Sequence, residues 1–97
     1  MDWKFDQVPN AACITVRSVI DGAPVLLVTH YDDDHSWAFL DGEVHDTTDA
    51  LVVAMATVLN VHPELQEIAD LLPGWSAIRT AVGQPWSKRQ DDWGDEA

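Results

Sequence analysis

The chain has 97 residues, enough for one domain with a single core. Seventeen acidic against five basic residues give a formal net charge of −12, which disfavours nucleic-acid binding and favours cationic partners. A hydrophobic content of 46%, with five tryptophans, excludes a disordered chain.

The single cysteine, Cys13, excludes an intrachain disulfide and a multi-cysteine zinc site. Its apolar neighbours indicate a buried structural residue. No stretch approaches the roughly 18 consecutive apolar residues of a membrane span. We therefore expect a cytoplasmic protein that binds no membrane.

The first part of the chain predicts three antiparallel strands. Residues 11–20 alternate apolar and polar side chains, and Asp21-Gly22 offers turn chemistry. Residues 24–31 are apolar on both faces, which is typical of a central strand. Residues 37–40 are apolar again after a short polar break, and the third strand is expected at residues 36–40. This order predicts a three-stranded antiparallel β-meander.

Two helices are predicted next. Asp46 or Thr47 can cap the first, which is expected to run to about Val61. Its β-branched residues, Val52 and Val53 among them, lower helix propensity and leave a strand as the alternative. Pro63 suits the first position of a second helix, which Pro73-Gly74 ends.

The C-terminal part is predicted to hold no helix. Residues 75–86 carry Trp75 and Trp86 beside turn residues and are expected to form a strap, either a strand or irregular. Residues 87–97 are highly charged and indicate a flexible tail. The predicted fold is α+β: a three-stranded antiparallel β-meander, two helices packed on one face and an aromatic C-terminal strap, with residues 1–86 as one globular domain.

The densest acidic cluster falls at the expected turn between the second and third strands. Loop tips on a rigid scaffold often carry function, although charge at a solvated turn is also ordinary. Aromatic rings beside turns often mark interfaces, and arginine can stack on an indole. The candidate binding residues are Asp32, Asp33, Asp34, Trp75, Arg79 and Trp86.

A metal site is the competing hypothesis. His30 and His35 flank the acidic cluster, and imidazoles with carboxylates can bind a transition metal. The spacing is not diagnostic, and solvated histidines explain the same residues. The chain also lacks a Gly-x-Ser-x-Gly nucleophile motif and a phosphate-binding glycine loop. We expect no cofactor and no catalytic residues.

Two motifs resemble a group of small bacterial proteins. Residues 37–42 read Trp-Ala-Phe-Leu-Asp-Gly, and residues 73–79 read Pro-Gly-Trp-Ser-Ala-Ile-Arg. The group carries Trp-Gln-Phe-Leu-Cys-Gly and Pro-Gly-Trp-x-Ala-x-Arg in that order, so the similarity covers most of residues 1–86. Asp41 stands here for the usual cysteine, which removes any chemistry of that thiol. The group has no assigned activity, so the resemblance implies only a bacterial cytosolic domain.

We therefore expect a non-enzymatic protein-binding module, of the immunity or regulatory type, for a basic protein partner. The alternative is a small metal-dependent protein or enzyme that uses His30, His35 and the Asp32–Asp34 cluster. The sequence leaves the oligomeric state open.

Overall fold

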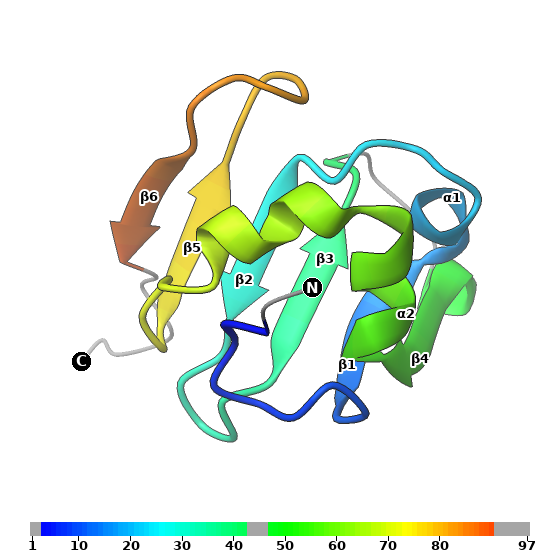
Figure 1. The fold of residues 1–97 in the computed structure, drawn as a ribbon, viewed down its shortest axis with the longest axis horizontal. Coiled ribbons are helices and arrows are strands. Elements are labelled where there is room, and N and C mark those ends of the chain that lie inside the picture. Colours follow the sequence, from blue (N-terminus) through cyan, green and yellow to red (C-terminus); the bar gives the residue numbers. More distant parts are fainter. Residues whose placement is uncertain (1–2, 43–46, 91–97) are drawn as a thin grey trace.

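One mixed β-sheet organises the molecule (Figure 1). A computed structural model describes residues 3–42 and 47–90, and these residues form six paired strands. The strands lie in the order β4-β1-β3-β2-β5-β6. The β1–β3 pair is parallel, and the other pairs are antiparallel. The strands in chain order are β1 (Ala12–Val16), β2 (Leu27–His30), β3 (Trp37–Leu40), β4 (Ala50–Ala54), β5 (Trp75–Ile78) and β6 (Ser87–Gln90).

Short helices cover one face of this sheet. Helix α2 and the 3₁₀ helix η2 lie in front of it in Figure 1. Apolar side chains from β3, α2 and η2 fill the space between the two layers, and the largest fully buried ones are Trp37, Phe39, Met55, Leu59, Leu65 and Ile68. The four helical segments of the described chain are α1 (Arg17–Ile20), η1 (Thr47–Asp49), α2 (Met55–Val61) and η2 (Pro63–Ile68).

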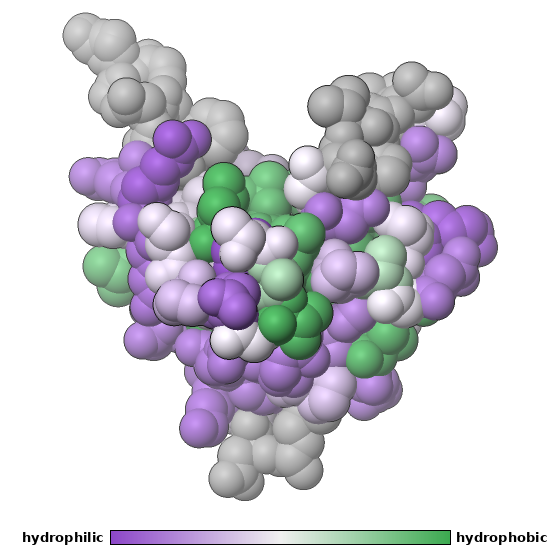
Figure 2. All heavy atoms as spheres, turned by 90° about the horizontal axis from the view of Figure 1, so that it is seen from above, coloured by the Kyte–Doolittle hydropathy of each residue, from purple (hydrophilic) through white to green (hydrophobic). Residues whose placement is uncertain are grey.

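On the opposite face of the sheet, Thr29 and Ala38 of the central strands are buried, but several apolar side chains of the other strands are exposed. Side chains alternate along each strand, so Ile14, Val52 and Ile78 point away from the core. Their exposed fractions are 37%, 73% and 51%. Seen from above in Figure 2, hydrophobic side chains also gather near the middle of the surface, at the end where β5 leads to β6. Apolar surface is thus accessible on a strongly acidic protein.

The predicted three-stranded meander is wrong. The β2–β3 hairpin is present, with His30 opposite Trp37. The first strand, however, ends at Val16 and lies between β3 and β4, so it does not pair with β2. After Val16 the chain forms the helical turn α1, and Asp21-Gly22 continues that turn through bonds to the carbonyls of Arg17 and Val19. The chain therefore leaves the sheet where a hairpin was expected.

The predicted helix at residues 46–61 is a strand followed by a helix. Residues 50–54 pair with β1 as β4, and α2 begins only at Met55. The β-branched Val52 and Val53 favour the extended chain once β1 offers a partner. Asp46, one of the two predicted caps, lies outside the described residues.

The remaining C-terminal elements also differ from the prediction. The helical segment after Pro63 is a 3₁₀ helix that ends at Ile68, well before Pro73. The expected strap is the first part of a β-hairpin, because β5 pairs with β6. Residues 87–90 were expected in the charged tail but form β6, so the predicted boundary at residue 86 falls inside this hairpin.

Candidate functional site

The turn between β2 and β3 presents three carboxylates to solvent. Asp32, Asp33 and Asp34 are all exposed. The Asp33 Oδ1 atom accepts the Asp34 N–H at 2.9 Å, and the Asp34 Oδ1 atom accepts the Ser36 N–H at 3.0 Å. Hydrogen bonding with Ser36 lowers the pKa of Asp34, so this carboxylate stays charged at neutral pH. No side chain in the described parts of the chain forms an ion pair with these three residues.

Contacts with two other segments hold this turn in place. The Gln7 amide donates a hydrogen bond to the His35 carbonyl at 3.2 Å. The Gly74 N–H donates to the His30 carbonyl at 2.7 Å. Gly74 has a φ of 86° and backs onto Asp32, because an added Cβ would lie 3.6 Å from the Asp32 Cβ. The acidic turn therefore lies beside residues 72–75.

An exposed apolar side chain belongs to that neighbouring turn. Leu72 is 60% exposed, and its carbonyl accepts the Trp75 N–H at 3.1 Å. Trp75 itself is half-buried and packs against the core. We call Asp32, Asp33, Asp34 and Leu72 the tip surface. It combines a fixed anionic turn with an apolar neighbour.

Arg79 and Trp86 lie together at the other end of β5. The Arg79 guanidinium stacks 4.3 Å from the centre of the Trp86 ring. Its Nη2 atom lies 3.2 Å from the Glu64 Oε2 atom, and its Nε atom donates to the Val25 carbonyl at 3.0 Å. Arg79 is only 4% exposed. Two of the predicted binding residues, Arg79 and Trp86, are thus in contact, but Arg79 is buried and cannot contact a partner directly.

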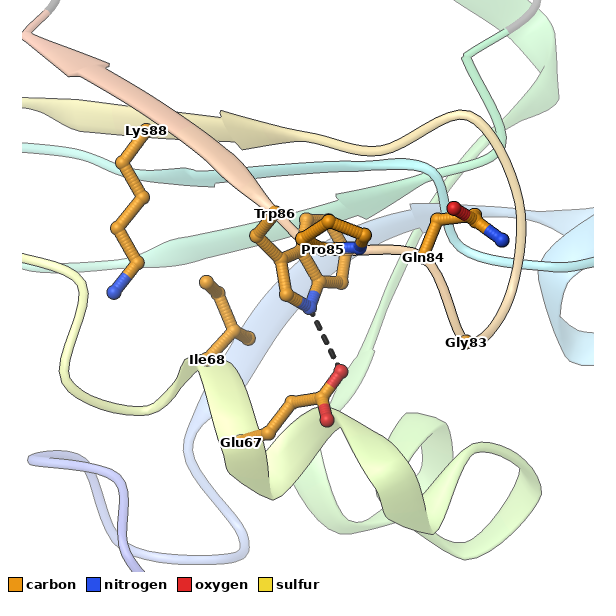
Figure 3. A pocket seen from close by; sticks show the side chains of 7 residues that line it. All are labelled: Glu67, Ile68, Gly83, Gln84, Pro85, Trp86 and Lys88. Atoms are coloured by element: carbon orange, nitrogen blue, oxygen red, sulfur yellow. Dashed lines mark hydrogen bonds between the residues drawn. The ribbon is translucent and has the colours of Figure 1, made fainter.

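A shallow groove runs beneath Trp86 (Figure 3). Its volume is about 480 Å³, and its lining residues are Glu67, Ile68, Gly83, Gln84, Pro85, Trp86 and Lys88. The Trp86 indole donates to the Glu67 Oε2 atom at 2.9 Å, as the dashed line shows. Sequence reasoning missed Glu67 and Lys88. Only the β5–β6 register, which the sequence does not reveal, brings Lys88 toward η2.

His30 belongs to the core and not to the acidic turn. The residue is 2% exposed, and its ring stacks on Trp37 at 3.9 Å. Its Nδ1 atom lies 2.8 Å from the Leu71 carbonyl oxygen. Its Nε2 atom lies 3.2 Å from the Asp6 Oδ2 atom but lacks hydrogen-bond geometry. Asp6, which sequence reasoning also missed, accepts the Trp37 indole N–H at 3.0 Å.

The proposed metal ligands are not assembled in the described part of the chain. Among those residues, no group of three or more histidine, cysteine, aspartate or glutamate side chains could hold a metal ion. The His30 and His35 rings meet edge to face at 5.9 Å. The geometry is that of aromatic packing beside a turn.

Comparisons with protein-family models, with curated proteins and with solved structures found no match. Within residues 3–42 and 47–90, no helix has both the length and the apolar character to span a bilayer. What the protein binds must therefore be inferred from its own side chains.

Proposed function

We propose that this protein is a non-enzymatic binding module that presents its tip surface to a basic protein partner. The observation that supports this proposal is the set of three exposed carboxylates held in one turn beside Leu72. A patch with an apolar residue among charges resembles the composition of transient protein interfaces. The role would be that of an immunity or regulatory protein.

Electrostatics favour a cationic partner. The net charge of −12 attracts basic proteins from a distance, and the tip surface concentrates part of that charge at one end of the sheet. Charge complementarity mainly raises the association rate, whereas a desolvated apolar contact mainly slows dissociation. Asp32, Asp33 and Asp34 are therefore assigned to steering and Leu72 to retention.

The other predicted binding residues contribute less. Arg79 is buried, so its part is to fix Trp86 and the groove wall. Trp75 and Trp86 are half-buried and can offer only the ring area that remains exposed. A metal-dependent function through His30, His35 and the acidic cluster would have to use the His30 Nε2 atom, which is buried and lies 3.2 Å from Asp6 Oδ2.

The test is an association experiment. A partner recovered by pull-down and identified by mass spectrometry is mixed with wild type or with a variant that carries Asp32→Asn, Asp33→Asn and Asp34→Asn. Asparagine keeps the turn chemistry but removes the charge. We expect a slower association rate for the variant, and a wild-type rate that falls steeply with added salt. Leu72→Ala is expected to raise the dissociation rate instead.

Two single variants provide a matched control. Asp33→Asn and Asp21→Asn each remove one exposed charge, but Asp21 follows α1, which lies at the opposite end of the molecule from the β2–β3 turn (Figure 1). We expect the first variant to slow association more than the second. Equal effects, or a wild-type rate indifferent to salt, would remove the tip surface from the interface.

A further inference from the structure

The two edges of the sheet differ sharply in composition. Strand β6 reads Ser-Lys-Arg-Gln, and its charged side chains protect that edge from pairing. Strand β4 reads Ala-Leu-Val-Val-Ala and contains no charge, proline or glycine. Its only neighbour in the described sheet is β1. An unprotected apolar edge of this kind is a template for another strand.

The hydrogen-bonding direction along β4 follows from one contact. The Met55 N–H donates to the Ala11 carbonyl at 2.8 Å, so it points toward β1. Backbone groups alternate in direction along an antiparallel strand. Leu51 and Val53 therefore bond to β1. The N–H and C=O groups of Ala50, Val52 and Ala54 point outward, away from β1.

We propose that this edge pairs with β4 of a second copy of the chain, antiparallel about a two-fold axis at Val52. The sequence Ala-Leu-Val-Val-Ala reads almost identically in both directions. Under this symmetry Ala50 faces the partner's Ala54, and Val52 faces the partner's Val52. Each of these pairs exchanges both N–H···O=C bonds.

The outward-pointing backbone N–H and C=O groups of β4 determine this register. A shift by one residue would place outward groups of one strand against inward groups of the other, which forms no ladder. A shift by two residues would leave part of the edge unpaired. The arrangement centred on Val52 is thus the longest antiparallel match between two copies of β4, and such a two-fold interface is self-complementary.

Side-chain placement also favours a second copy. Net charges of −12 repel, but β4 itself adds no charge to the contact. Val52 is 73% exposed and lies on the face opposite the helices, beside Ile14, its register partner in β1. Pairing would bring the two Val52 side chains together and join the apolar faces of both sheets. The charged β6 edges would remain at the two ends, so assembly stops at a dimer.

Sedimentation across a concentration series tests the proposal. A five-residue strand pairing is a small interface, so we expect reversible association between about 1 µM and about 1 mM. Val52→Pro removes an outward N–H that the β1 ladder does not use, and Val52→Lys places two positive charges on the axis. Both variants are expected to be monomeric, with folding checked by circular dichroism.

Ile78→Lys is the matched control, because Ile78 lies on the same face but on β5, away from the β4 edge. We expect this variant to dimerise like wild type. A wild type that stays monomeric throughout, or a dimer that survives Val52→Pro, would overturn the proposal. Loss of the dimer in Ile78→Lys with its retention in Val52→Pro would indicate face-to-face stacking instead.

A crosslinking experiment checks the register independently. Residues opposite each other in a hydrogen-bonded pair have Cα atoms about 5.5 Å apart, which suits a disulfide. Val52→Cys is therefore expected to form a covalent dimer on mild oxidation, with the link between the two introduced thiols identified by mass spectrometry. Ile78→Cys should form no covalent dimer under the same treatment. Cys13 does not compete, because it is 2% exposed. Equal crosslinking of both variants would contradict the proposed register.

Discussion

Buried polar side chains connect neighbouring elements through main-chain carbonyls. The Thr15 hydroxyl donates to the Phe39 carbonyl at 2.7 Å and joins β1 to β3. The His62 Nε2 atom lies 3.0 Å from the Val19 carbonyl oxygen and joins α1 to the end of α2. His30 makes the equivalent contact with Leu71. The Thr15 hydroxyl, the His62 Nε2 atom and the His30 Nδ1 atom are each satisfied inside the core, whereas the buried His30 Nε2 atom forms no hydrogen bond.

Cys13 is predicted to be inert and to make stability depend on pH. Burial raises the pKa of its thiol from 9.0 to about 12. In the unfolded chain the thiol ionises near its ordinary pKa. The free energy of unfolding should therefore be unaffected below about pH 9 and fall as pH rises toward 12. Urea denaturation across this range measures the effect.

A Cys13→Ala variant is the control for other groups that titrate at high pH. Its free energy of unfolding should fall less than that of wild type over the same pH range. At pH 8 the native thiol should react with a disulfide reagent far more slowly than the unfolded one. Rapid reaction of the native protein would show that the thiol is accessible.

Phe39 is predicted to be chiefly structural. Its ring is fully buried and meets Phe5 edge to face at 6.0 Å. Phe39→Ala should lower the free energy of unfolding by about 3–5 kcal/mol, because it removes a large ring and leaves a cavity. Chemical denaturation followed by tryptophan fluorescence measures the loss. Ile78→Ala, at a position 51% exposed, should change it by less than about 1 kcal/mol. Similar losses in both would place Phe39 outside the core.

At the scale of elements, the sequence pattern predicted the strand pairing only where the two strands are close together in the chain. The β2–β3 hairpin joins segments close in sequence, and its acidic turn was expected from composition alone. Strand β4 was predicted as helix because a capping signal precedes it, whereas its true partner, β1, lies far away in the chain. Non-local pairing overrides a weak helix preference when the residues are β-branched.

In the candidate site, too, the sequence predicted features of one local segment but not contacts between distant segments. The exposure of Asp32, Asp33 and Asp34 agrees with a charged turn. The burial of Arg79 could not be predicted, because Glu64 and Glu67 reach it from η2 and Trp86 from beside β6. Sequence spacing does not show which of seventeen acidic residues will meet one guanidinium.

The contact between η2 and the β5–β6 hairpin is predicted to depend on two glutamates. The Arg79 side chain is fully buried, and its nearest carboxylates belong to Glu64 and Glu67. Replacing both with glutamine leaves a buried cation without a counter-charge. We expect a loss of about 2 kcal/mol, below the value for a fully buried pair because both glutamates are partly exposed.

Urea denaturation measures that loss. Asp70→Asn is the control, since Asp70 pairs with Lys88 at the surface and should cost less than about 1 kcal/mol. A double variant as stable as this control would mean that the carboxylates do not stabilise the buried charge.

For the whole molecule, the imbalance of charge is predicted to oppose folding. Seventeen acidic residues are brought close together when the chain becomes compact. Sodium chloride screens their repulsion, so the thermal midpoint should rise between low salt and about 0.5 M, where the Debye length is a few ångströms. Calorimetry measures the midpoint. A variant with Asp32→Asn, Asp33→Asn and Asp34→Asn should show a smaller rise. A midpoint that falls with salt would mean that attractive ion pairs dominate.

The position of β1 in the sheet also sets an order of folding. This strand is synthesised early, but its neighbours, β3 and β4, begin only at Trp37 and Ala50. The β2–β3 hairpin needs only a short loop closure, so it can form while β1 is still unpaired. The parallel β1–β3 contact then closes a long segment at a higher entropic cost. During synthesis, the apolar residues of β1 therefore stay without a partner strand until β3 emerges, which makes this strand the part of the nascent chain most exposed to misassociation.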